Sequence, residues 1–181
     1  FHLGVDVGKG AQSFETLRET HDALLIATGV YKARDIRLPG TGLEGIVPAL
    51  DYLTASNRKS LGDAVPAFDK GILNAAGKDV VVIGGGDTAM DCVRTAVRQK
   101  ARSVSCLYRR DRANMPGSQR EVANAEEEGV VFNWLSAPQA FIGDEKVRAV
   151  RAQRIHLGQP DATGRQVPEV IEGSSHDLPA N

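Results

Sequence analysis

The feature of this sequence that most constrains its fold is a short apolar run that leads directly into a cluster of glycines. Residues 80–83 are three valines and an isoleucine, which is typical of a strand buried on both faces. Gly84 to Gly86 follow at once, and the apolar residues of 89–97 recur at i, i+4, i+7 and i+8, which places them on one face of a helix. This order of strand, glycine turn and helix predicts one unit of a parallel α/β sheet.

The glycine turn also carries the pattern Gly84-x-Gly86-x-x-Ala89, which is typical of dinucleotide-binding units. Gly84 would allow the tight turn, Gly86 would let the backbone approach a pyrophosphate, and Ala89 would let the helix pack closely on the strand. The unpaired N–H groups of the first helical turn would face the phosphates, although Asp87 and Thr88 are also residue types that begin an ordinary helix. The expected pyrophosphate site comprises Gly84, Gly85, Gly86, Asp87, Thr88 and Ala89.

A second stretch, residues 40–45, fits the same glycine pattern in its strict form. Roughly 0.4 matches to the pattern are expected by chance at this glycine content, so the pattern alone decides nothing. Residues 35–39 mix charges with a proline, which argues against a central strand, and Pro48 prevents a helix from beginning much earlier. We predict a loop over residues 40–45.

A second strand, expected over residues 103–108, distinguishes the glycine pattern of residues 84–89 from a chance match. It ends at Arg109-Arg110-Asp111-Arg112, and the residue type at this position of a dinucleotide-binding unit selects the coenzyme. An acid would hold the ribose 2′-hydroxyl of NAD, whereas arginine accommodates the 2′-phosphate of NADP. The two consecutive arginines favour NADPH, with Arg109 and Arg110 as phosphate ligands and Arg112 as a further candidate. The alternatives are Asp111 as a ribose acid, or a solvated basic loop.

Three segments, Gly84–Asp91, Tyr108–Ser118 and Ala23–Gly29, resemble the family of small (β) subunits of NADPH-dependent glutamate synthases. More broadly they resemble the FAD and iron–sulfur electron-input oxidoreductases built like them, including the corresponding part of dihydropyrimidine dehydrogenase. The resemblance implies that NADPH passes a hydride to FAD and that iron–sulfur clusters carry the electrons to a large (α) subunit. That subunit makes L-glutamate from L-glutamine and 2-oxoglutarate. Hydride transfer between cofactors depends on orientation, so no catalytic side chain is expected here.

The resemblance also implies how the chain is divided. Residues 1–33 would be the tail of an FAD domain, with the backbone of Thr28 and Gly29 near the isoalloxazine. Residues 34–48 would connect the domains, and residues 49–181 would be an NADPH-binding domain that lacks its last strand. The chain is therefore expected to be a fragment, with FAD bound mainly by residues outside it and iron–sulfur clusters present only in the full-length protein.

The remaining elements are expected from periodicity, caps and turn residues, and together they predict an α/β fold: a Rossmann-like βαβαβ unit plus a β-hairpin. Before residue 34 we expect an edge strand over 3–8, a helical turn over 15–19 and a buried strand over 23–27. After it we expect two helices: one from Pro48 at its first position to about Arg58, and one begun by the capping box Ser118-x-x-Glu121 and ended by Gly129. We also expect a third parallel strand over 130–135 and a hairpin of 147–157 with 166–171.

Composition excludes several classes of function. The formal net charge of −1 offers no basic footprint for nucleic acid or a membrane surface. No apolar run approaches the roughly 18 residues of a membrane span, and no signal peptide is visible. Cys92 and Cys106 lie in apolar patterns, so we expect reduced core residues in a cytoplasmic protein. The four histidines share no metal-binding spacing, and no metal site is expected.

Two alternatives to the glutamate synthase function stay open. Another flavin and iron–sulfur oxidoreductase would use the same NADPH-input module with a different electron acceptor. The isolated chain would instead be a nucleotide-binding module without turnover, because neither an FAD fingerprint nor a set of cluster ligands is found in its sequence.

Overall fold

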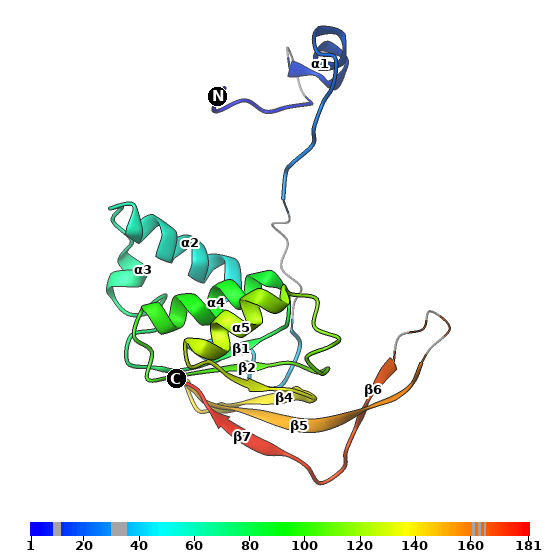
Figure 1. The fold of residues 1–181 in the computed structure, drawn as a ribbon. Coiled ribbons are helices and arrows are strands. Elements are labelled where there is room, and N and C mark those ends of the chain that lie inside the picture. Colours follow the sequence, from blue (N-terminus) through cyan, green and yellow to red (C-terminus); the bar gives the residue numbers. More distant parts are fainter. Residues whose placement is uncertain (9–11, 30–35, 161, 163, 165) are drawn as a thin grey trace. The chain divides into compact units, whose positions relative to one another are not determined.

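The structure, a computed structural model, describes residues 1–8, 12–29, 36–160, 162, 164 and 166–181 (Figure 1). The chain forms two compact units, Phe1–Lys32 and Ala33–Asn181. The predicted boundary between residues 33 and 34 lies outside the described residues.

The described part of the first unit contains one regular element, helix α1 (Phe14–Thr20), which confirms the predicted helical turn. The two predicted strands over 3–8 and 23–27 are wrong, because the chain forms no strand there and Leu25 is 92% exposed. A strand needs a neighbour for its backbone N–H and C=O groups, and the described residues of this unit supply none.

Three parallel strands form the centre of the second unit, in the order β1-β2-β3. They are β1 (Asp79–Ile83), β2 (Ser103–Leu107) and β3 (Val131–Asn133). The three predicted parallel strands are thus confirmed. Because Ile83 at the end of β1 is in register with Leu107 at the end of β2, the carboxyl ends of the two strands lie side by side.

Helices α4 and α5 cover one face of this sheet (Figure 1). The helices of the unit are α2 (Ala49–Ser60), α3 (Pro66–Asp69), α4 (Asp87–Arg98) and α5 (Gln119–Glu127). The predicted helices over 48–58 and after Ser118 are confirmed, and Gly129 follows α5 with a φ of +93°, as a helix-ending glycine does. Residues 40–45 are a loop of turns, as predicted.

Two details of the helix starts were predicted wrongly. Pro48 is the N-cap of α2 and not its first helical residue. Ser118 is the N-cap of α5, but no side-chain hydrogen bond caps this helix, so the capping box does not form. Glu121, its expected second member, instead forms an ion pair with Arg94 of α4, because a guanidinium offers a stronger partner than a neutral backbone N–H.

A second, antiparallel sheet covers the other face of the parallel sheet, and it contains the predicted hairpin. Its strands are β4 (Ser136–Gly143), β5 (Val147–Pro160), β6 (Gln166–Val170) and β7 (His176–Pro179). The order is β4-β5-β6, with β7 also paired to β5. Strands β4 and β7 were not predicted, and each carries a proline that weakens the strand pattern.

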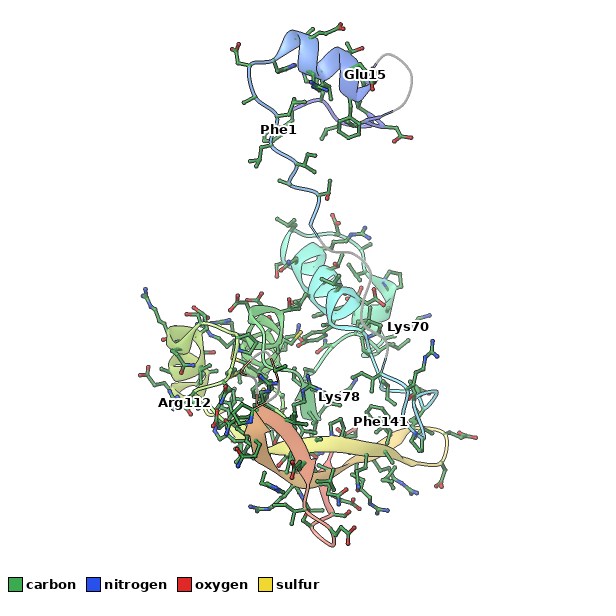
Figure 2. All side chains as sticks on the ribbon, turned by 90° about the vertical axis from the view of Figure 1, so that its right-hand side faces the viewer. Phe1, Glu15, Lys70, Lys78, Arg112 and Phe141 are labelled. Carbon is green, nitrogen blue, oxygen red and sulfur yellow. The ribbon has the colours of Figure 1, made fainter. Side chains whose placement is uncertain are left out.

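Apolar side chains fill both faces of the parallel sheet. Met90 of α4 and Val122 of α5 are fully buried in the core beneath the helices. On the other face Leu107, Val150 and Phe141 pack together between the two sheets; Phe141 lies on β4 (Figure 2). Each such side chain contributes about 1.5–3 kcal/mol when it is removed from water, so both layers stabilise the central strands.

Leu135 joins the two sheets, and it ends β3 earlier than predicted. Its backbone is left-handed, with a φ of 49°, so it cannot continue a strand. Its N–H donates to the Arg110 carbonyl (3.1 Å), and its carbonyl accepts a hydrogen bond from the Ile155 N–H (2.8 Å). The residue therefore ties the loop after β2 to the middle of β5.

Lys100 generates a prediction about stability. It follows α4 with a φ of 63°, a conformation that costs a residue with a Cβ about 1 kcal/mol but costs glycine nothing. Lys100→Gly should therefore raise the free energy of unfolding by about 0.5–1 kcal/mol, measured by urea denaturation. Lys100→Ala keeps the Cβ and should not stabilise the protein; equal stabilisation by both substitutions would contradict this explanation.

Candidate functional site

The glycine turn lies at the carboxyl end of β1 and leads directly into α4. Gly84 has a φ of +143°, which favours glycine, and its N–H donates to the Leu107 carbonyl of β2 (3.1 Å). A Cβ on Gly84 would lie 3.7 Å from the Cβ of Ala89, so a small residue at position 89 lets the turn and helix pack closely. Gly86 is the N-cap of α4, with an extended backbone.

The start of α4 offers unpaired hydrogen-bond donors. The backbone N–H groups of Gly86, Asp87 and Thr88 donate to no other group in the described part of the chain. A Cβ on Gly86 would meet no heavy atom within 4 Å, so the space beside the turn is open there. Unpaired N–H groups and the positive end of the helix dipole together favour a bound anion.

Tyr108 forms one wall of the turn. A Cβ on Gly85 would lie 2.5 Å from the Tyr108 ring, so position 85 has no room for a side chain. The Tyr108 hydroxyl donates to the Asn114 carbonyl (3.0 Å), and its ring packs edge-on against Trp134 with centroids 6.4 Å apart. The ring is therefore held from two sides, and it in turn fixes the path of the turn.

The loop after β2 also binds back to the turn, which the sequence did not predict. The Gly117 N–H donates to the Gly85 carbonyl (2.9 Å), and the Ser118 N–H donates to Oδ1 of Asp87 (3.0 Å). A Cβ on Gly117 would lie 3.1 Å from that carbonyl oxygen, so the approach needs glycine or a local shift. The only signal in the sequence was a glycine after Pro116, which indicates a turn but not its contact.

The three predicted phosphate-binding arginines have different surroundings. Arg109, which directly follows Tyr108, is exposed and its side chain has no partner among the described residues. Arg110 is half-buried: its Nη2 lies 3.4 Å from the Gln166 carbonyl, and its Nε is buried without a partner. Arg112 is bound to α5 through an ion pair with Glu126 (2.8 Å) (Figure 2). Arg109 and Arg110 thus keep available donors at the end of β2, whereas Arg112 is already engaged.

Thr28 and Gly29, the predicted flavin contacts, belong to the first unit. Both are exposed, and Gly29 has a φ of +69°. Their contact with FAD stays a prediction.

The two cysteines are buried and unpaired, as predicted. Cys106 of β2 donates its thiol hydrogen to the Gly84 carbonyl (3.3 Å). Burial raises the pKa of the Cys106 thiol to about 12, and burial together with the charge of Asp91 raises the pKa of Cys92 to about 12. Both thiols are therefore neutral at physiological pH and serve packing.

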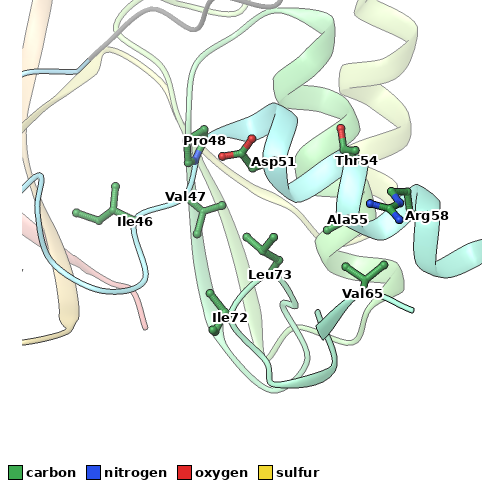
Figure 3. A pocket seen from close by; sticks show the side chains of 10 residues that line it. All are labelled: Ile46, Val47, Pro48, Asp51, Thr54, Ala55, Arg58, Val65, Ile72 and Leu73. Carbon is green, nitrogen blue, oxygen red and sulfur yellow. The ribbon is translucent and has the colours of Figure 1, made fainter. Parts of the chain in front are cut away.

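A groove of about 480 Å³ lies beside α2 (Figure 3). Mainly apolar side chains line it, including Val47, Val65 and Leu73, and none of the predicted coenzyme-binding residues does. In the described part of the chain, no group of three or more His, Cys, Asp or Glu side chains could hold a metal ion, and no helix is long and apolar enough to cross a membrane.

Comparison with known proteins gives one family. Residues 3–163 match the family described as pyridine nucleotide-disulphide oxidoreductase. The whole chain is 66% identical to the glutamate synthase (NADPH) small chain of Azospirillum brasilense and 49% identical to that of Halomonas elongata. It spans only 37% and 38% of the lengths of these two relatives.

A solved structure shares the fold. Mycobacterium tuberculosis FprA in complex with NADPH matches 98% of this chain with a TM-score of 0.72, and the match covers 52% of FprA. The two sequences are 20% identical, so this likeness concerns the fold alone.

The turn makes opposite predictions for two neighbouring glycines. Gly85→Ala should lower the free energy of unfolding by about 1–3 kcal/mol, because the new methyl group would overlap the Tyr108 ring. Gly86→Ala should change stability by less than about 0.5 kcal/mol, because its φ of −90° suits alanine and the space is open. Thermal and urea unfolding of both variants measure the contrast, and equal destabilisation would show that the turn is packed differently.

The raised thiol pKa values predict chemical inertness. Neither cysteine should react with a disulfide reagent at pH 8 while the protein is folded, and both should react once it is denatured. In the unfolded chain a thiol ionises near pH 9.0, so raising the pH from about 9 towards 12 should favour unfolding. Fast labelling of the native protein would mean that one thiol is accessible.

Proposed function

Because the chain belongs to the pyridine nucleotide-disulphide oxidoreductase family, we propose that it is the NADPH-binding part of a glutamate synthase small subunit. The observation that carries the proposal is the glycine turn at the start of α4, where the backbone N–H groups of Gly86, Asp87 and Thr88 have no partner among the described residues and the space beside Gly86 is open. The 66% identity to the Azospirillum brasilense small chain supports the choice of family member.

In this proposal the coenzyme lies across the carboxyl ends of β1 and β2. The pyrophosphate accepts hydrogen bonds from the N–H groups of Gly86, Asp87 and Thr88, with Gly84, Gly85 and Ala89 shaping the turn. The guanidinium groups of Arg109 and Arg110 bind the 2′-phosphate. Arg112 is a weaker candidate for binding the 2′-phosphate, because its ion pair with Glu126 would have to break first.

The described part of the first unit contains one helix, α1, and its start offers no open site for the phosphates of a flavin. In the first unit, α1 begins at a Ser13 cap whose hydroxyl already accepts the Thr16 N–H (3.2 Å), so this helix start is occupied. We propose that residues 1–33 are the edge of an FAD domain, with Thr28 and Gly29 near the flavin and FAD held mainly by residues outside this chain. Residues 34–48 would connect that domain to the NADPH-binding domain of residues 49–181.

In the whole protein, FAD would accept the hydride, and iron–sulfur clusters would carry the electrons to a large (α) subunit that makes L-glutamate from L-glutamine and 2-oxoglutarate. The contribution of this chain is to bind and orient NADPH, which needs no acid or base from its side chains. The unpaired buried thiols fit a cytoplasmic protein.

The alternative is a nucleotide-binding module without turnover, favoured by the missing flavin cradle. Another oxidoreductase with a different electron acceptor would use the same coenzyme site. Flavin absorbance of the purified chain tests the module without turnover. A yellow sample that NADPH reduces would contradict it, because the chain would then hold flavin by itself.

Coenzyme selectivity tests the proposal. Replacing Arg109 and Arg110 together by alanine should weaken NADPH binding about 10- to 100-fold and leave NADH binding within about twofold, because only NADPH carries the 2′-phosphate. Calorimetric titration with both coenzymes measures the change. Arg148→Ala is the matched control, because Arg148 of β5 is also exposed but pairs with Asp144 in the turn between β4 and β5. Unchanged selectivity in the double variant would show that the phosphate binds elsewhere.

A further inference from the structure

A cavity of about 550 Å³ lies where the carboxyl ends of β2 and β3 meet the β5–β6 hairpin. Small-molecule sites commonly occupy about 300–1,000 Å³, so its size suits part of a nucleotide. Its lining comes from three parts of the second unit and includes Asp111, Trp134, Leu135, Arg154, His156 and Gln166.

Arg154 of β5 is the unengaged cation of this cavity. Its guanidinium has no hydrogen-bond or ion-pair partner among the described residues. Alternate residues of a strand share a face, so Arg154 projects from the same face of β5 as Ala152, which packs with Leu107 of β2. The Arg154 side chain is exposed and lines the cavity.

Arg110 brings a second guanidinium to the rim. Its Nη2 is 3.4 Å from the carbonyl of Gln166, which lines the cavity, and its Nε is buried without a partner. The acids nearby are already engaged: Oδ1 of Asp111 accepts the N–H of Asn114 (2.9 Å), and Glu169 pairs with His156 (2.9 Å). Two guanidiniums thus keep unused donors around one cavity, which suits a phosphate.

Trp134 supplies an aromatic wall that is held in place. Its ring stacks on Phe132 with centroids 4.7 Å apart and packs edge-on against Tyr108. An aromatic surface beside apolar Leu135 and a pair of guanidiniums is the combination that a purine nucleotide with an added phosphate needs.

We infer that this cavity receives the adenosine 2′-phosphate end of the coenzyme, with Arg154 from the second sheet as a further residue that selects the phosphate. The inference rests on the proposed function. A dinucleotide whose pyrophosphate lies at Gly86, after β1, and which runs along the carboxyl ends of the strands in the order β1-β2-β3 reaches the cavity at the ends of β2 and β3. Arg154 and Gln166 of the hairpin then border the adenosine together with Arg110 of the β2 loop, whose Nη2 lies 3.4 Å from the Gln166 carbonyl.

The test uses adenine nucleotides and the single tryptophan of the chain, Trp134, as reporter. Binding of 2′,5′-ADP should change its fluorescence in a saturable way. Arg154→Ala should weaken 2′,5′-ADP binding about 10- to 100-fold and leave the weaker binding of 5′-AMP within about twofold, and Arg154→Lys should restore part of the loss. Arg151→Ala is the matched control, because Arg151 lies on the opposite face of β5 and pairs with Asp177 (2.8 Å).

The outcomes separate this inference from the proposed function. If the Arg109/Arg110 double variant loses 2′,5′-ADP binding while Arg154→Ala binds like the parent, the inference is wrong and the proposed function stands. If Arg154→Ala weakens the binding of 2′,5′-ADP and of 5′-AMP equally, Arg154 does not recognise the 2′-phosphate, and this result also overturns the inference. If 2′,5′-ADP neither binds the parent protein nor changes its fluorescence, the proposed function itself fails.

Discussion

The parallel pairing of β1 with β2 is the interaction on which the rest of the second unit depends. Because Ile83 is in register with Leu107, the glycine turn and the arginine-bearing loop leave the sheet at neighbouring points. The pairing is secured from both sides, by the helix core around Met90 and by the core between the sheets around Val150. A slip of the pairing would carry Tyr108 away from Gly85 and remove the wall that fixes the turn.

The turn is held by contacts distant in the sequence as well as by its own residues. The Tyr108 ring blocks one side of Gly85, and the Gly117 N–H donates a hydrogen bond to the Gly85 carbonyl. These contacts leave the N–H groups of Asp87 and Thr88 unpaired while the surrounding backbone is fixed, which is the preorganisation that an anion site requires. Binding then costs little ordering of the protein, and the affinity depends mainly on the charges that reach the ligand.

Most of the second unit could be predicted from the sequence, because its strong signals are local. The apolar run of residues 80–83 and the glycines after it need no distant partner to be interpreted. The hairpin strands are recognised because β-branched and charged residues are mixed on both sides of a turn rich in glycine and proline. Predictions failed where pairing decides the outcome: β4 and β7 become strands only beside β5, and the run 23–27 has no partner in the described residues. Glu121 was misassigned for the same reason, since its partner Arg94 belongs to another helix.

The left-handed residue between the two sheets has a mechanical consequence. The Leu135 N–H donates to the Arg110 carbonyl, and the Leu135 carbonyl accepts a hydrogen bond from the Ile155 N–H, so one residue is bonded to both the arginine loop and β5. A displacement of the hairpin by more than the tolerance of a hydrogen bond would break one of these bonds or drag the arginine with it. The hairpin and the arginine loop are thus mechanically coupled, so a displacement of one requires a displacement of the other.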